Sequence, residues 1–113
     1  MKQSWIFVIL ISFIVTGLLA ECEKKEPAST AEQVKMGEAL FKQHCSLCHP
    51  DGGNTVNPQR TLHKNDREAN GIKTASDIVN NMRNPGPGMT KFDKKTLPDK
   101  DADAIAEYIL KTF

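Results

Sequence analysis

The chain has 113 residues and a formal net charge of +1, from 15 Lys and Arg against 14 Asp and Glu. This length fits one small globular domain and excludes a multi-domain enzyme. The balanced charge excludes generic binding to nucleic acid or to an anionic surface through a surplus of positive charge. Aromatic residues make up only 6% of the chain, so the large side chains that usually build a core are scarce.

The first 21 residues have the pattern of a cleaved signal peptide. Lys2 supplies a positive start, and residues 5–20 form an almost uninterrupted apolar stretch. The alternative is a membrane-spanning helix, but a helix of this length reaches only about 24 Å against a hydrocarbon core of ~30 Å. We therefore expect residues 1–21 to be removed and the chain to be exported.

The junction at residues 19–22, Leu-Ala-Glu-Cys, resembles a bacterial lipobox, in which the cysteine becomes the lipid-carrying first residue. Glu21 departs from the Gly or Ala that usually precedes this cysteine, and the alternative is a soluble protein with a stray thiol at Cys22. Lipidation is favoured because an unpaired thiol is a liability in an oxidising compartment. Glu23 is not the Asp that commonly retains lipoproteins at the inner membrane, so we expect outer-membrane attachment.

Residues 22–29 are charged, contain Pro and lack bulky apolar side chains, which predicts a short tether before a single domain over residues 30–113. The domain opens with a capping-box pattern, Ser29-x-x-Glu32. Apolar residues then recur at helical spacing until the chain reaches Cys45. This pattern predicts a first helix that delivers the cysteines to the site.

Two further segments have the apolar spacing of amphipathic helices. One covers residues 75–84, with Ser76 as its candidate cap, and ends where the next Pro disfavours helix. The other covers residues 99–113 and has an acidic start and a clear apolar stripe. A short helix is expected at residues 64–69, and no segment shows the alternation of a strand. The fold is therefore predicted to be all-α, with three main helices and short helical turns.

Residues 45–49, Cys-Ser-Leu-Cys-His, are the strongest chemical signal in the chain. Two thiols three positions apart at the end of a helix can add to the two vinyl groups on one edge of haem, and the adjoining histidine can reach the iron. We therefore predict covalent haem at Cys45 and Cys48, with His49 as an iron ligand. The other ring N–H of His49 needs an acceptor, which we expect to be a backbone carbonyl near residues 57–58.

Other interpretations of the two cysteines remain open at this point. A zinc site would need His44 or His63 as a further ligand and would crowd Cys48 and His49 into one corner of a tetrahedron. A thioredoxin-like redox pair would need a βαβ context, and an exported chain can also hold a plain disulfide. Haem is favoured, and its apolar macrocycle would also supply core mass that a domain this small lacks.

The ligand on the opposite face of the haem separates an electron carrier from a protein that binds small molecules. Met89 is the candidate, because it follows the rigid, tightly turning residues 85–88, Pro-Gly-Pro-Gly, which can hold a thioether over the iron. Met82 continues the apolar stripe of its helix and is expected in the core, and Met36 precedes the haem motif. Ligation by His63, or an iron with no sixth ligand, would also fit the sequence.

Gly37 and Phe41 before the motif, with Ile105 and Tyr108 near the end of the chain, resemble the pattern of class I cytochromes c. In that family a Gly and an aromatic residue in the first helix pack against an aliphatic and an aromatic residue in the last. The segment after the motif is similar to the small photosynthetic c-six cytochromes in residues Gly52, Gly53, Asn54, Val56, Pro58, Thr61 and Leu62. Residues 30–113 also resemble monohaem outer-membrane cytochrome lipoproteins of metal-reducing bacteria, in the stretches Gly-Gly-Asn-Thr-Val, Arg-Glu-Ala-Asn-Gly and Arg-Asn-Pro-Gly-Pro-Gly-Met.

The resemblance implies a small class I cytochrome c fold wrapped around one covalent haem c, with Met89 and His49 as the axial iron ligands. Thr90 departs from the Pro that follows the axial Met in many relatives. Thr96 stands, after the two lysines of residues 94–95, where some relatives have an Arg. The resemblance therefore leaves the contacts to the haem propionates open.

Together these features predict a monomeric electron carrier and not an enzyme, since two axial ligands close the iron and leave electron exchange at the haem edge. Its expected partners are other redox proteins, foremost c-type cytochromes, and not nucleic acid. The domain is expected in the periplasm, with membrane contact only through a lipid on Cys22 at the outer membrane. The resemblance alone implies an outward, metal-reducing electron route. The alternative function is a haem-based gas sensor or peroxidase-like protein with a labile sixth ligand.

Overall fold

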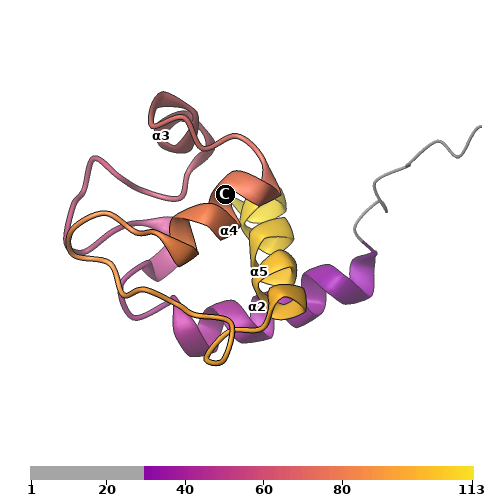
Figure 1. The fold of residues 1–113 in the computed structure, drawn as a ribbon. Helices are drawn as coiled ribbons and strands as arrows, with labels where there is room; N and C mark the ends of the chain where they lie inside the picture. The colour runs from indigo at the N-terminus through magenta and orange to yellow at the C-terminus, as the bar shows by residue number, and fades with distance from the viewer. Residues whose placement is uncertain (1–29) are drawn as a thin grey trace, which may run out of the picture.

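The computed structural model describes residues 30–113, in which helices follow one another without any strand. They are α2 (Ala31–His44), the 3₁₀ helix η1 (Pro50–Gly52), α3 (Lys64–Ala69), α4 (Ala75–Arg83) and α5 (Asp99–Thr112). Helix α5 crosses α2 and also packs against α4 (Figure 1). The prediction of an all-α fold with three main helices and short helical turns is confirmed. The predicted signal peptide and tether lie outside the described residues.

The helix starts differ in detail from the sequence prediction. Helix α2 is capped by Thr30, whereas the predicted cap, Ser29, lies outside the described residues. Helix α4 is capped by Thr74, and the prediction of Ser76 was wrong. Thr74 is favoured because Asp77 stands three residues later: the Thr74 hydroxyl accepts the Asp77 N–H at 3.1 Å, and the Asp77 carboxylate accepts the Thr74 N–H at 2.8 Å. None of the helices in the described range is long and apolar enough to cross a bilayer.

The crossing of α2 and α5 depends on Gly37. A Cβ atom at this position would lie 2.0 Å from the carbonyl oxygen of Ala104 and 2.9 Å from the Cβ of Tyr108. One turn later, the buried Phe41 ring lies 5.3 Å from the Tyr108 ring, between centroids, and Ile105 is fully buried. The packing expected between the first and last helices is therefore present. The wider buried core consists of Phe41, Ile78, Met82, Leu97, Ala102, Ile105, Ala106 and Ile109.

Phe113 connects the loop after the cysteines to this core. Its ring lies 5.5 Å from that of Phe41, and a Cβ at Gly52 would lie 2.5 Å from its Cδ1 atom. Gly52 also has a φ of 77°, which glycine adopts without strain. The Phe113 carbonyl accepts the N–H of Lys64 at 2.9 Å. Phe113 therefore contacts both the loop after the cysteines and the start of α3.

We predict that Gly37→Ala strongly destabilises the haem-loaded protein, because the added methyl group must push α2 and α5 apart at a backbone contact. The free energy of unfolding should fall by about 3 kcal/mol, measured by urea denaturation. Lys35→Ala is the control, because Lys35 is an exposed residue of the same helix; its stability should change by less than ~0.5 kcal/mol. Equal stability of the two variants would contradict this account of the crossing.

Candidate haem site

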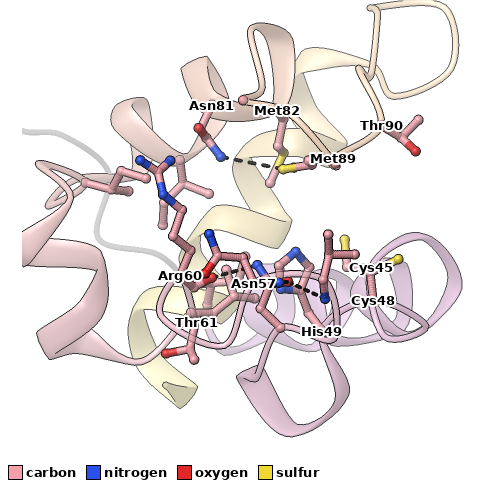
Figure 2. Close-up of a pocket in the computed structure, with 18 of the residues that line it drawn as sticks. Cys45, Cys48, His49, Asn57, Arg60, Thr61, Asn81, Met82, Met89 and Thr90 are labelled. Atoms are coloured by element: carbon pink, nitrogen blue, oxygen red, sulfur yellow. Dashed lines mark hydrogen bonds between the residues drawn. The ribbon is translucent and has the colours of Figure 1, made fainter.

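A large pocket opens between the end of α2, the loop after it, α4 and the loop before α5 (Figure 2). It encloses roughly 1260 Å³ not filled by atoms, part of it open to solvent. Its apolar walls include Leu62, Ile72, Ile78, Met82, Leu97 and Ile109. This combination of size and apolar lining fits a haem macrocycle.

Both cysteines of the motif lie on this pocket because the chain keeps a helical course beyond α2. The Cys45 N–H donates to the Phe41 carbonyl at 2.8 Å, and the N–H groups of Cys48 and His49 donate to the Cys45 carbonyl at 3.1 and 2.9 Å. Burial raises the pKa of the Cys45 thiol to about 11, with a smaller contribution from Cys48. Cys45 is thus partly buried and Cys48 is exposed, and both lie on the wall of the pocket.

The imidazole of His49 is held by a backbone carbonyl. Its Nδ1 lies 2.8 Å from the Gly53 oxygen, which leaves Nε2 as the nitrogen available to a ligand. The prediction that a backbone carbonyl near residues 57–58 accepts the ring N–H of His49 was wrong. A tight turn, in which the Gly53 N–H donates to the Pro50 carbonyl at 2.8 Å, brings Gly53 back to the histidine. The Asn57 carbonyl instead accepts the N–H of Arg60 at 2.9 Å.

Met89 lies across the pocket from His49 (Figure 2). The side-chain amide of Asn81, on α4, donates to the Met89 sulfur at 3.6 Å, within the range for a sulfur acceptor. The turn before Met89 requires Gly88, which has a φ of 89° and would bring a Cβ to 2.9 Å from Val56. Side chains from two different elements therefore face each other across a space suited to the haem.

The remaining candidate ligands lie elsewhere or are already engaged. Met82 also lines the pocket, but it is only 4% exposed and belongs to the core, as predicted. Met36 and His63 are not among the pocket residues, and the His63 ring packs edge-on against Phe113 at 5.9 Å. The His44 ring packs edge-on against Phe92 at 6.2 Å. Among residues 30–113, no group of three or more His, Cys, Asp or Glu side chains could hold a metal ion.

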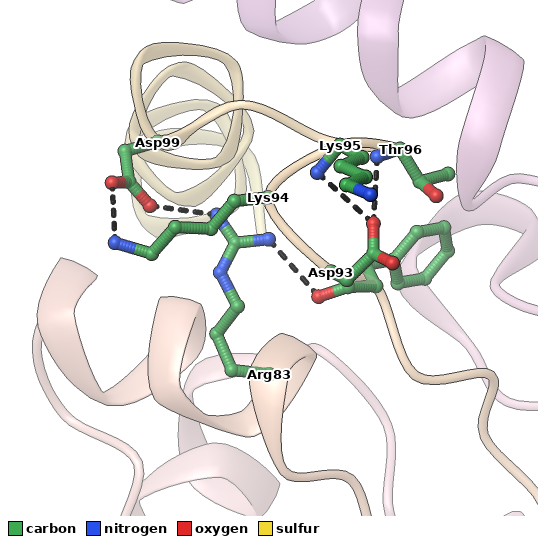
Figure 3. A network of polar contacts seen from close by, with 7 residues as sticks. Arg83, Asp93, Lys94, Lys95, Thr96 and Asp99 are labelled. Atoms are coloured by element: carbon green, nitrogen blue, oxygen red, sulfur yellow. Dashed lines mark hydrogen bonds and ion pairs between the residues drawn. The ribbon is translucent and has the colours of Figure 1, made fainter.

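The loop that carries Met89 is anchored at its far end by a polar network (Figure 3). The guanidinium of Arg83 donates to the Phe92 carbonyl at 3.0 Å and to the Asp99 carboxylate at 2.9 Å. Lys94 donates to the second oxygen of Asp99 at 2.8 Å. Hydrogen bonds from Lys94 and Arg83 hold the pKa of Asp99 below its usual value. These contacts attach the loop to both α4 and α5.

Three polar residues of the pocket lining were not predicted from the sequence: Asn81, Arg60 and Arg67. Asn81 follows Ile78 by three positions on the inner face of α4, a spacing that marks it as facing the pocket. Arg60 stands in a polar loop and Arg67 on a short charged helix, where no sequence pattern separates a pocket residue from a solvated one.

Helices packed around a pocket that carries the Cys-Ser-Leu-Cys-His segment define a class of small haem proteins. The family model described as "Cytochrome C oxidase, cbb3-type, subunit III" matches residues 32–109. Cytochrome c6 from Cyanidium caldarium is 32% identical over 100 residues, covering 88% of this chain and 90% of that protein.

Solved structures give the same result. Outer membrane cytochrome F from Geobacter sulfurreducens is 51% identical, with a TM-score of 0.67 over 68% of this chain and 98% of that one. Cytochrome c6C from Synechococcus sp. PCC 7002 is 28% identical, with a TM-score of 0.63 over 67% of this chain and 92% of that one. The chain belongs to the cytochrome c family, as a small monohaem class I member that carries electrons on one covalently bound haem c and is not an enzyme.

Proposed function

We propose that Cys45 and Cys48 form the thioether bonds to the haem and that His49 and Met89 are its two axial iron ligands. The observation that carries this proposal is that Met89 faces His49 across the pocket, with the two cysteines at its edge (Figure 2). When bound, haem c supplies reversible one-electron chemistry at its iron. The protein keeps both ligand side chains in place and excludes water from the iron.

Two hydrogen bonds prepare the ligands for this role. The Gly53 carbonyl fixes the orientation of the His49 ring, and such an outer partner raises the basicity of the imidazole. The Asn81 amide donates to the Met89 sulfur, which orients the thioether into the pocket. Methionine ligation raises the reduction potential and leaves no position at the iron for a substrate, which suits a carrier.

We further propose that the carrier works in the bacterial cell envelope, where it passes single electrons between c-type cytochromes and other redox proteins as a monomer. Such partners meet at small, transient interfaces. The apolar stretch before residue 21 supports export. The similarity to outer membrane cytochrome F from Geobacter sulfurreducens supports outer-membrane attachment. The outward, metal-reducing route rests on the resemblance of residues 30–113 to cytochrome lipoproteins of metal-reducing bacteria.

The attachment itself is assigned to Cys22. In this proposal residues 1–21 are removed, a lipid is added at Cys22, and residues 22–29 form the tether from the membrane to the domain at residues 30–113. An unpaired thiol in an oxidising compartment supports modification of this cysteine.

The ligand assignment predicts that Met89→Ala abolishes the weak red methionine-to-iron charge-transfer band of the oxidised protein. Met82→Leu is the matched control, because Met82 also lines the pocket but lies in the core, and it should keep the band. The measurement is the visible spectrum of each haem-loaded variant, with the reduction potential lower in Met89→Ala. A band that survives in Met89→Ala and disappears in Met82→Leu would overturn the assignment.

The tether proposal predicts that the mature chain starts at Cys22 and carries a lipid when it is produced in a host that processes lipoproteins. Mass spectrometry of the N-terminal peptide should show the mass of the modified cysteine. Cys22→Ser serves as the control and should give a protein that is recovered without detergent. An unmodified Cys22 in the wild-type protein would contradict the proposal while leaving the haem site unaffected.

A further inference from the structure

Arg67 is a buried charge that lines the haem pocket. It lies on α3, is only 4% exposed, and is the buried charged residue of the described core. Its Nε donates to the Leu62 carbonyl at 2.7 Å, which is a neutral acceptor and leaves the two terminal nitrogens of the guanidinium for other partners. Arginine is almost never buried unless it is paired with an anion.

The two carboxylates adjacent to Arg67 in the sequence have other partners. Asp66 accepts a short hydrogen bond from the hydroxyl of Thr61. Glu68 faces Lys64, four residues earlier, at 4.0 Å. Within residues 30–113, no ion pair involves Arg67. The anion that balances this buried charge must therefore come from the contents of the pocket.

The segment at residues 94–96, where the family resemblance left the propionate contacts open, does not line the pocket. Lys94 is paired with Asp99, and the Thr96 N–H donates to the Asp93 carboxylate at 2.8 Å. Arg60 does line the pocket, but it is exposed. Arg67 is therefore the cation that is both buried and on the pocket wall.

We infer that Arg67 binds a propionate carboxylate of the bound haem and thereby fixes the haem edge against α3. This inference rests on the proposed haem site and adds a positioning residue to it. A buried positive charge can pair with a carboxylate through charge-assisted hydrogen bonds. In a buried site, a fixed positive charge near the haem also favours the reduced iron, which carries one positive charge fewer than the oxidised iron.

The test uses three variants of the haem-loaded full chain: Arg67→Met, Arg67→Lys and Lys64→Met. Lys64→Met is the matched control, because it removes one positive charge from the same helix at a side chain that is 71% exposed. Potentiometric titration should show that Arg67→Met lowers the equilibrium constant for reduction about tenfold, which is a fall of about 59 mV for one electron. Arg67→Lys and Lys64→Met should each stay within about threefold of wild type.

Several results would overturn the inference. If the reduction potential of Arg67→Met changes no more than that of Lys64→Met, Arg67 binds no haem carboxylate. If the potentials of Arg67→Lys and Arg67→Met fall by the same amount, Arg67 acts only through its hydrogen bond to the Leu62 carbonyl. If Arg67→Met does not mature, Arg67→Lys decides alone, and a tenfold shift in that variant counts against the inference.

Two further measurements separate a haem propionate from a free anion and from a failure of the haem site itself. A wild-type potential that depends on phosphate concentration at constant ionic strength, and loses this dependence in Arg67→Met, would assign the site to a free anion and overturn the inference. The methionine-to-iron band must persist in all three variants. Its absence from the wild-type protein would mean that the proposed iron ligation has failed, which is a distinct result from an unchanged potential in Arg67→Met.

Discussion

The structure depends on one constraint: the side chains of this small domain do not fill its centre. Among the described residues, the largest fully buried side chains are Leu97 and Ile105, and Leu97 lies on the wall of a pocket of roughly 1260 Å³ that is partly open to solvent. Helices α2 and α5 stabilise the fold where they touch directly at Gly37, while α4 and the loops contribute apolar side chains to the pocket wall. A covalently bound macrocycle then completes a core that a chain of this size builds poorly alone.

Some features of the site are set by residues adjacent in the sequence, and others by residues that only the fold brings together. The first kind could be predicted from the sequence. The helices and the core position of Met82 were predictable because they follow from periodicity. The pairing of Gly37 and Phe41 with the last helix was predictable only from the family resemblance. The segment proposed to attach the haem, residues 45–49, is also local, since five adjacent residues carry its chemistry. The pocket that surrounds this segment comes from the fold.

The cap of α4 is a local feature that the prediction of Ser76 missed, since Thr74 has Asp77 three positions later. The remainder required the three-dimensional arrangement. The partner of His49 is the Gly53 carbonyl, which only the turn around η1 brings into reach. The spacing of Asn81 from Ile78 places it on the inner face of α4 but does not identify the Met89 sulfur as its partner. Arg67 looks in the sequence like an ordinary polar residue of a short helix, and its burial comes from the fold.

The central claim is that His49 and Met89 occupy both axial positions of the iron, so that the protein exchanges electrons and binds no substrate there. The most direct measurement is the rate of carbon monoxide binding to the reduced, haem-loaded protein at neutral pH, followed by stopped-flow absorbance. The account predicts no rapid binding by the wild-type protein. Rapid binding by the wild-type protein would show an open or labile position at the iron and would contradict the account in favour of a gas sensor or peroxidase-like protein.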